Sequence, residues 1–273
     1  MKKFELTSEF ITNIFGTKLF RIKALISFGN VEAGEKGGYI EKEENLDQSG
    51  NAWVSGDARV SGDARVYGNA WVYGNARVYG DAWVSGDAWV SGNARVSGDA
   101  EVSGNARVYG NAWVYGNARV SGDARVSGDA WVYGDAEVSG DAEVSGNARV
   151  SGDAEVSGNA RVYGNAWVSG DADYAVVQGF GSHFRTTTFF RTKDKEVKVV
   201  CGCFFGTIAE FKEKVKNTHG NGKYAKEYLA IAAAMEVHFD ITTECAQCGR
   251  ECVKEDALET ANGDICEECL EDN

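Results

Sequence analysis

Two cysteine pairs near the C-terminus are the residues whose type and spacing most directly imply chemistry. Two residues separate Cys245 from Cys248, and after seventeen further residues the same spacing separates Cys266 from Cys269. Four thiolates in two close pairs can surround one Zn²⁺ tetrahedrally, and the intervening length is typical of zinc ribbons. Four thiolates leave no open coordination position, so we expect a structural Zn²⁺. Free thiols or disulfides are the alternative.

The rest of the chain is organised by one six-residue phrase, Gly-(Asn/Asp)-Ala-x-Val-(Ser/Tyr), which occurs twenty times between Gly50 and Asp171 without insertion or deletion. Ala and Val stand two residues apart, so both point to one side of a short strand, while x (Trp, Arg or Glu) and Ser/Tyr point to the other. Each Gly-Asn/Asp pair predicts a turn, because these residues tolerate positive φ. The fixed period predicts a solenoid whose coils stack strand on strand.

Read from its valine, the phrase becomes Val-(Ser/Tyr)-Gly-(Asn/Asp)-Ala-x, an aliphatic residue followed four positions later by a small one. In this form it resembles the hexapeptide repeat of left-handed parallel β-helix proteins, in which three hexapeptides make one triangular coil. The resemblance implies a mainly β protein with a left-handed parallel β-helix of about seven coils.

The flanking sequences predict smaller units. Residues 1–49 are expected to form an N-terminal cap, since an open solenoid end exposes unpaired backbone groups. Residues 50–174 then form the β-helix, residues 175–240 a small α+β module that covers the solenoid end, and residues 241–273 the zinc-ribbon-like tail.

Weaker patterns locate elements inside these flanking units. Ile40 and Leu46 lie twelve and six residues before Ala52, which predicts two degenerate repeats with both side chains in the alanine register. After the repeats we expect strands near Ala175–Gln178, Arg185–Arg191 and Glu196–Cys201, followed by two helices. The first helix begins with the capping box Thr207-Ile208-Ala209-Glu210. The expected apolar stripes are Ile208, Phe211 and Val215 on the first helix, and Tyr224, Tyr228, Ile231 and Met235 on the second.

Histidine is missing from the repeats. Many left-handed β-helix proteins are acyltransferases with a histidine general base, or carbonic anhydrases that hold a metal with three histidines. Here His183, His219 and His238 all follow the repeats, which also lack Lys and Cys. General-base chemistry on the solenoid would need an exposed Asp or Glu, with nothing in the sequence to raise its pKa. An acyl-CoA-dependent acyltransferase acting at a subunit boundary stays open as an alternative, with His183 as its candidate base.

The outward positions gather into ladders if every third phrase lies on one face. The candidate binding residues are two aromatic patches, Trp53, Trp71, Tyr73 and Trp89, and Trp113, Tyr115, Trp131 and Tyr133, together with the ladder Arg59, Arg77 and Arg95. All seven tryptophans are expected on this exterior. Contiguous exposed aromatic residues usually mark a contact surface, and stacked arginines favour an anion or an acidic partner. Outward aromatics that only stack along the strands are the alternative interpretation.

Composition restricts the partners and the location. A net charge of −13 is poorly suited to tracking a phosphate backbone, which argues against a nucleic-acid partner. Lys18, Arg21 and Lys23 interrupt the only candidate apolar stretch near the N-terminus, which argues against a signal peptide or a membrane span. We therefore expect a cytoplasmic protein with its cysteines reduced or metal-bound.

The whole layout, from Gly37-Gly38-Tyr39-Ile40 through the repeats to the small C-terminal module, resembles hexapeptide-repeat proteins of bacterial and phage genomes that are often labelled acyltransferases. Because fold alone does not establish function, we interpret the chain as a non-catalytic, rigid binding or scaffold protein. The resemblance implies that it is phage-associated and located in a bacterial host cell. Its Trp, Tyr and Arg ladders would meet a protein partner or a second copy of the chain, as in a homo-oligomer. The alternatives are the acyltransferase and a protein that sequesters nucleotides or other anionic ligands.

Overall fold

The computed structural model describes residues 2–14, 16–244, 246–248, 251–253, 258–260, 263–265 and 269. The chain divides into two compact units, Met1–Asp171 and Ala172–Asn273. Within the described part of the chain, no helix is long and apolar enough to cross a membrane.

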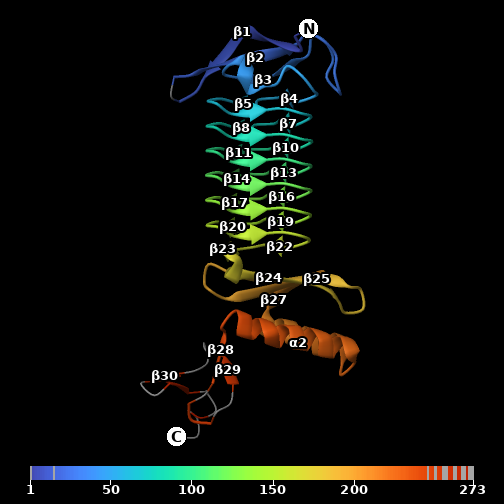
Figure 1. Ribbon diagram of the computed structural model, residues 1–273, viewed down its shortest axis with the longest axis vertical. Coiled ribbons are helices and arrows are strands. Elements are labelled where there is room, and N and C mark those ends of the chain that lie inside the picture. The colour runs from blue at the N-terminus through green and yellow to red at the C-terminus, as the bar shows by residue number, and fades with distance from the viewer. Residues whose placement is uncertain are drawn as a thin grey trace. The chain divides into compact units, whose positions relative to one another are not determined.

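The first unit contains a β-solenoid of stacked coils, with one two-residue strand in each repeat (Figure 1). The repeat alanines and valines from Ala52 to Val168 fill its interior and are buried. The predicted inward register is therefore confirmed. A narrow interior of small and β-branched side chains removes apolar surface from water along the whole solenoid.

The strands form three parallel sheets, because each residue pairs with the one 18 positions later, as Trp89 does with Arg107. This confirms that every third repeat lies on one face. The first sheet contains β4 (Trp53–Val54), β7 (Trp71–Val72), β10 (Trp89–Val90), β13 (Arg107–Val108), β16 (Arg125–Val126), β19 (Glu143–Val144) and β22 (Arg161–Val162). The second, here called the ladder face, contains β5 (Arg59–Val60), β8 (Arg77–Val78), β11 (Arg95–Val96), β14 (Trp113–Val114), β17 (Trp131–Val132), β20 (Arg149–Val150) and β23 (Trp167–Val168). The third contains β6 (Arg65–Val66), β9 (Trp83–Val84), β12 (Glu101–Val102), β15 (Arg119–Val120), β18 (Glu137–Val138) and β21 (Glu155–Val156).

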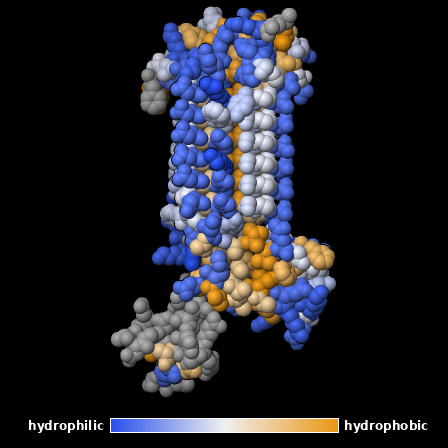
Figure 2. Space-filling view, in the orientation of Figure 1, coloured by the Kyte–Doolittle hydropathy of each residue, from blue (hydrophilic) through white to orange (hydrophobic). Residues whose placement is uncertain are grey.

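The corners between the sheets depend on glycine. Gly116 has a φ of +72°, and a Cβ at this position would lie 3.0 Å from the backbone nitrogen of Gly134 in the next coil. Glycine is therefore needed both for the turn and for the close stacking of the corners. Beside the glycines the amide side chains form ladders, as where Asn111 Nδ2 donates to Asp129 Oδ1 at 2.9 Å. Figure 2 shows straight rows of similar hydropathy along the solenoid.

The N-terminal strands extend the ladder-face sheet. They are β1 (Phe4–Thr12), β2 (Lys18–Ala24) and β3 (Lys36–Ile40), followed by the short 3-10 helix η1 (Glu43–Asn45). β1, β2 and β3 pair antiparallel, and β3 then pairs with β5 in parallel, so this sheet has ten strands.

Ile40 and Leu46 do not stand in the predicted alanine register. Ile40 pairs with Val60 and Leu46 bridges to Val66, so both occupy the valine register, each 20 residues from its partner instead of 18. The additional residues follow Leu46, where Asp47 accepts hydrogen bonds from the backbone nitrogen and the hydroxyl of Ser49. A shift of two residues keeps a side chain on the same side of a strand. Both side chains therefore still point inward and are buried.

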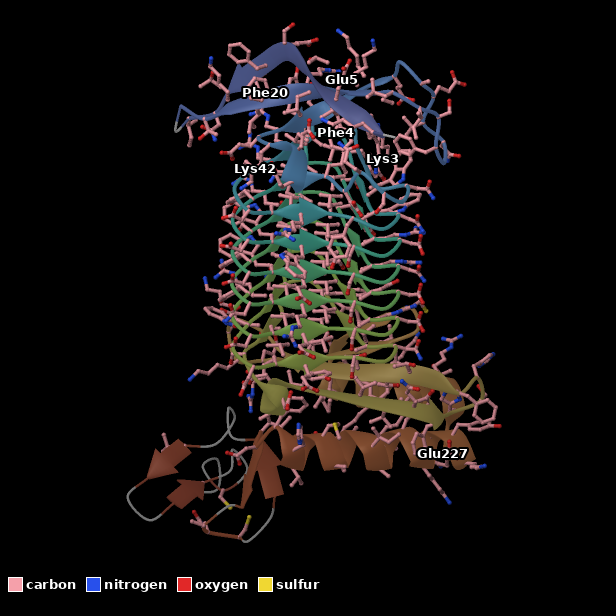
Figure 3. All side chains as sticks on the ribbon, turned by 45° about the horizontal axis from the view of Figure 1, so that its top comes forward. Lys3, Phe4, Glu5, Phe20, Lys42 and Glu227 are labelled. Carbon is pink, nitrogen blue, oxygen red and sulfur yellow. The ribbon has the colours of Figure 1, made fainter. Side chains whose placement is uncertain are left out.

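Lys3 is buried at the first coil. Its Nζ donates to the carbonyl oxygens of Ala52 at 2.9 Å and Ser49 at 3.2 Å, and lies 5.0 Å from the centroid of the Phe28 ring. Figure 3 shows Lys3 and Phe4 at the N-terminal end of the solenoid. Burial lowers the pKa of Lys3 to about 8, against an opposing contribution from Asp47.

The second unit begins with a four-stranded antiparallel sheet followed by two helices. Its elements are the 3-10 helix η2 (Asp171–Asp173) at the boundary, β24 (Tyr174–Phe180), β25 (Arg185–Arg191), β26 (Val197–Cys201), β27 (Phe204–Thr207), α1 (Ile208–His219) and α2 (Lys223–His238). The three predicted strands and both helices are present, whereas the short β27 immediately before α1 was not predicted. The capping box is confirmed, since Glu210 N donates to Thr207 Oγ1 and Thr207 N donates to Glu210 Oε2.

The core of this unit lies between the sheet and the helices. The predicted stripe of α1 is buried in it. On α2 the buried residues are Ala225, Tyr228 and Ala232, while Tyr224 is 39% exposed, so the buried face is rotated from the predicted one. Two hairpins follow, β28 (Thr242–Glu244) with β29 (Glu251–Val253) and β30 (Leu258–Thr260) with β31 (Gly263–Ile265).

Candidate functional site

The arginine ladder is the most strongly charged feature of the ladder face. Arg59, Arg77 and Arg95 pair in register on adjacent strands, which places three like charges about 4.8 Å apart along the solenoid. None of the three forms an ion pair with a described residue. Their positive charge is therefore not neutralised by a direct partner in the described chain.

A groove of about 660 Å³ runs beside this ladder. The loop between β1 and β2 forms its other side with Thr12, Asn13 and Thr17. That loop is closed by hydrogen bonds between Asn13 and Thr17, including one from Thr17 N to Asn13 Oδ1 at 2.9 Å. Among the described lining residues the single carboxylate is Glu41, which accepts a hydrogen bond from Gly62 N at 2.7 Å. The groove therefore combines a cationic side with a loop in which Asn13 and Thr17 are hydrogen-bonded to each other.

The second predicted aromatic patch continues the arginine ladder. The indoles of Trp113 and Trp131 stack with their centroids 5.4 Å apart, and the rings of Tyr115 and Tyr133 stack at 5.0 Å. Burial, reinforced by the neighbouring Tyr133, raises the pKa of Tyr115. These four side chains are partly buried. They form the stacking ladder that one interpretation of the sequence predicted, and they remain partly accessible.

The first predicted aromatic patch is smaller than expected, because Trp53 is buried. Phe4 and Phe28 contact its indole edge-on, with ring centroids at 6.5 and 5.4 Å, and a Cβ at Gly37 would lie 2.7 Å from its Cζ2 atom. The expectation that all seven tryptophans lie on the exterior was therefore wrong. The repeat points Trp53 outward, but the N-terminal segment folds over it, so Trp53 belongs to the core and cannot contact a partner.

The remainder of that patch is accessible. Trp71 and Tyr73 are partly buried, and Trp89 is 43% exposed. Tyr73 contacts Trp89 edge-on at 6.2 Å, and Arg107 lies 5.1 Å above the Trp89 ring. Trp83, on the third sheet, is also 43% exposed, although it belonged to neither predicted patch. A repeat shows which way a side chain points, but local neighbours decide how much of it water reaches.

The predicted zinc ligands are only partly within the described residues. Cys245 and Cys266 lie outside them. Cys248 is exposed and lies between β28 and β29, and Cys269 is buried and follows β31. No group of three potential metal ligands occurs among the residues that the structure describes. The four-cysteine site stays a prediction.

His183, the candidate base of the acyltransferase alternative, lies in the turn between β24 and β25. Its Nδ1 is 2.8 Å from Ser182 Oγ, and both residues are exposed. A hydroxyl and an imidazole at this distance could exchange a proton. The turn belongs to the second unit and not to the solenoid.

Comparison with known protein families supports the repeat architecture. The model of the YdcK beta-solenoid repeat matches six segments of the chain, at residues 58–74, 70–86, 100–116, 112–128, 118–134 and 154–170. All six lie in the solenoid, so the chain contains a β-solenoid whose repeats are similar to that family. A search of the curated proteins found no match.

Proposed function

We propose that this chain is a non-catalytic, rigid binding protein whose ladder face contacts an acidic segment of a partner protein. The supporting observation is the row of Arg59, Arg77 and Arg95, which forms no ion pair with a described residue and lines a groove. Guanidinium groups bind carboxylates through paired, charge-assisted hydrogen bonds. A partner with several carboxylates in a row would neutralise the ladder.

The spacing of the ladder favours a helical segment. Strands along the solenoid repeat every ~4.8 Å, and side chains three or four positions apart on a helix lie about 5–6 Å apart at Cβ. A helix with glutamates at i, i+4 and i+7 could therefore face all three arginines. Ile14 and Tyr79 are exposed, line the same groove and offer apolar contact to such a helix.

The aromatic ladder extends this surface. Arg95 lies 4.5 Å from the Trp113 ring, so the arginine and tryptophan rows form one continuous strip. Trp and Arg are the residue types that most often carry binding energy at interfaces. Self-association through this strip and the binding of a nucleotide or another small anion at the arginines are the competing versions of the proposal.

Three further features belong to the proposal. The coils are left-handed, by resemblance to hexapeptide-repeat proteins. Residues 1–49 cap the first coil, which the burial of Trp53 and the hydrogen bonds of Lys3 to coil carbonyls support. The C-terminal tail holds a structural Zn²⁺ at Cys245, Cys248, Cys266 and Cys269.

Fluorescence anisotropy with a labelled, glutamate-rich helical peptide tests the main proposal. The triple substitution Arg59→Gln, Arg77→Gln and Arg95→Gln should weaken binding at least about tenfold. The control triple Arg107→Gln, Arg125→Gln and Arg161→Gln removes the same charge from another face. It should change the Kd of the peptide less than about twofold. No binding, or equal loss in both triples, would show that the ladder is not the site. Binding of coenzyme A by the native protein would favour the acyltransferase instead.

A further inference from the structure

A second cavity lies wholly within the second unit and is separate from the ladder face. It has a volume of about 250 Å³ and is lined by the turn between β24 and β25, the turn between β26 and β27, and the helices α1 and α2. Four elements that are distant in sequence therefore contribute to one small cavity. None of the candidate binding residues named from the sequence lines it.

The interior of this cavity is apolar and fixed by packing. Phe211, Val215 and Tyr228 line it and are buried in the core of the unit. The Phe211 ring meets that of Tyr228 edge-on at 5.7 Å, and Phe204 packs against Phe211 at 5.4 Å. Rings held by the core give the cavity a preformed apolar floor that could accept a ring or a short hydrocarbon chain.

The other ionisable side chains of the lining are mostly basic. His183, Arg185, Lys214 and His219 all line the cavity, and no described lining residue carries a carboxylate. Neither Arg185 nor Lys214 forms an ion pair with a described residue. The cavity therefore presents a cationic rim above an apolar floor.

Arg185 is positioned by the turn between β26 and β27. Gly202 in that turn has a φ of +61°, and a Cβ there would collide with the guanidinium of Arg185. The absence of a side chain at Gly202 lets Arg185 lie directly against the turn. Cys201 and Cys203 flank Gly202 and also line the cavity.

The acidic residue next to the cavity-lining Tyr228 on α2 already has a hydrogen-bond partner and an ion-pair partner. Glu227, labelled in Figure 3, accepts a hydrogen bond from Gly181 N at 3.0 Å and pairs with Lys223 at 3.5 Å. The neighbouring Tyr228 donates its hydroxyl proton to the carbonyl oxygen of Phe180 at 3.4 Å. Burial and the adjacent Cys201 raise the pKa of Tyr228 to about 12, so this hydroxyl adds no negative charge at neutral pH.

We propose that this cavity binds a small amphipathic anion, a molecule with one apolar ring or short chain and one carboxylate or phosphate group. The apolar part would lie against Phe211 and Tyr228, and the anionic group would pair with Arg185 and Lys214. A cavity of about 250 Å³ admits a ligand of roughly a dozen non-hydrogen atoms. The site is independent of the proposed contact surface on the ladder face.

Calorimetric titration of the full chain with benzoate, phenyl phosphate and benzyl alcohol tests the site. The three probes share a ring and differ in charge. We expect at least one anion to bind with a Kd of about 1 mM or lower, and benzyl alcohol to bind at least about tenfold more weakly. The anion that binds more tightly distinguishes a carboxylate site from a phosphate site.

Three variants locate the binding. Arg185→Gln with Lys214→Gln should weaken anion binding at least about tenfold. Lys216→Gln, on the same helix but outside the lining, should leave it unchanged. Thr218→Phe replaces an exposed lining residue and should block the cavity without disturbing the core. Failure of both anions to bind, equal binding of the alcohol, or unchanged binding in the double variant and in Thr218→Phe would each overturn the proposal.

Discussion

The indole rings of Trp113 and Trp131 stack across adjacent strands of the ladder face, with their centroids 5.4 Å apart and their planes 11° apart. Arg95 lies 4.5 Å from the first ring and Arg149 lies 4.7 Å from the second. The two indoles thus belong to a continuous row of stacked cations and rings. Its guanidinium groups and ring edges belong to the surface that we propose contacts a partner.

The stacking of Trp113 and Trp131 should be measurable as a coupling energy. In a double-mutant cycle with alanine, the two substitutions should couple by about 0.5–1.5 kcal/mol in the free energy of unfolding, because each indole loses its ring partner. Trp89 lies on another sheet, so the control cycle of Trp89→Ala with Trp131→Ala should show almost no coupling. Equal coupling in the two cycles would contradict a specific stack. Sedimentation of the Trp113→Ala and Trp131→Ala double variant also shows whether these rings hold an oligomer together.

The inward register predicts opposite outcomes for two aspartate substitutions. Val114 is buried, so Val114→Asp places an unpaired carboxylate in the interior and should cost at least about 3 kcal/mol of stability. Ser121 occupies an outward position, and Ser121→Asp should cost less than about 1 kcal/mol. Thermal unfolding followed by circular dichroism compares the two variants. Similar melting temperatures would rule out the register.

Substitution by alanine should destabilise the fold more at a corner glycine than at a glycine that also has positive φ but open surroundings. Gly116 and Gly34 both have positive φ, at +72° and +91°, but only a Cβ at Gly116 would approach the next coil, whereas nothing lies within 4 Å of one at Gly34. Gly34→Ala should cost about 1–2 kcal/mol from backbone strain alone. Gly116→Ala should cost at least about 1 kcal/mol more, because neighbouring corners must move apart. Chemical denaturation measures both, and equal losses would show that close stacking does not contribute.

Lys3 should make stability depend on pH above neutrality. Its pKa is lowered in the fold to about 8 from 10.5, so between these values the unfolded chain binds more protons than the folded chain. The contribution of Lys3 to the free energy of unfolding is therefore lowest below pH 8 and rises as the pH increases toward 10.5. Methionine does not titrate, so Lys3→Met is the reference. Relative to this variant, the free energy of unfolding of the native protein should increase by about 1–3 kcal/mol between pH 7.5 and 10. A constant difference between the two proteins across this range would contradict the effect of burial.

Metal removal should affect the C-terminal tail and leave the solenoid folded. Protein purified under reducing conditions should contain one Zn²⁺ per chain, and Cys248→Ser or Cys269→Ser should abolish it, because three thiolates hold the ion far more weakly than four. Cys203→Ser, at an exposed cysteine outside the motif, is the matched control and should retain the metal. Elemental analysis gives the stoichiometry. Native protein without stoichiometric metal would refute the site.

The repeat sequence by itself determined the inward register, the three faces and the membership of each ladder. Side chains alternate between the two sides of a strand, so their positions in the repeat determine which of them point inward. Because the six-residue period is unbroken, the same alternation holds in every coil. Residues such as Val114 and Arg95 could therefore be placed from the sequence. The capping box at Thr207 was equally local, since it depends on residues three positions apart.

Near the ends of the repeats, tertiary structure decided which side chains are buried and where cavities form. Trp53 has the same place in its repeat as Trp71, yet only Trp53 is covered by the N-terminal segment. The groove beside the arginine ladder and the cavity beside Arg185 depend on loops that no periodic pattern positions. Contacts between residues that are distant in the chain depend on packing and not on local preference. The repeat therefore shows which way a side chain points, but it does not show which distant residues that side chain contacts.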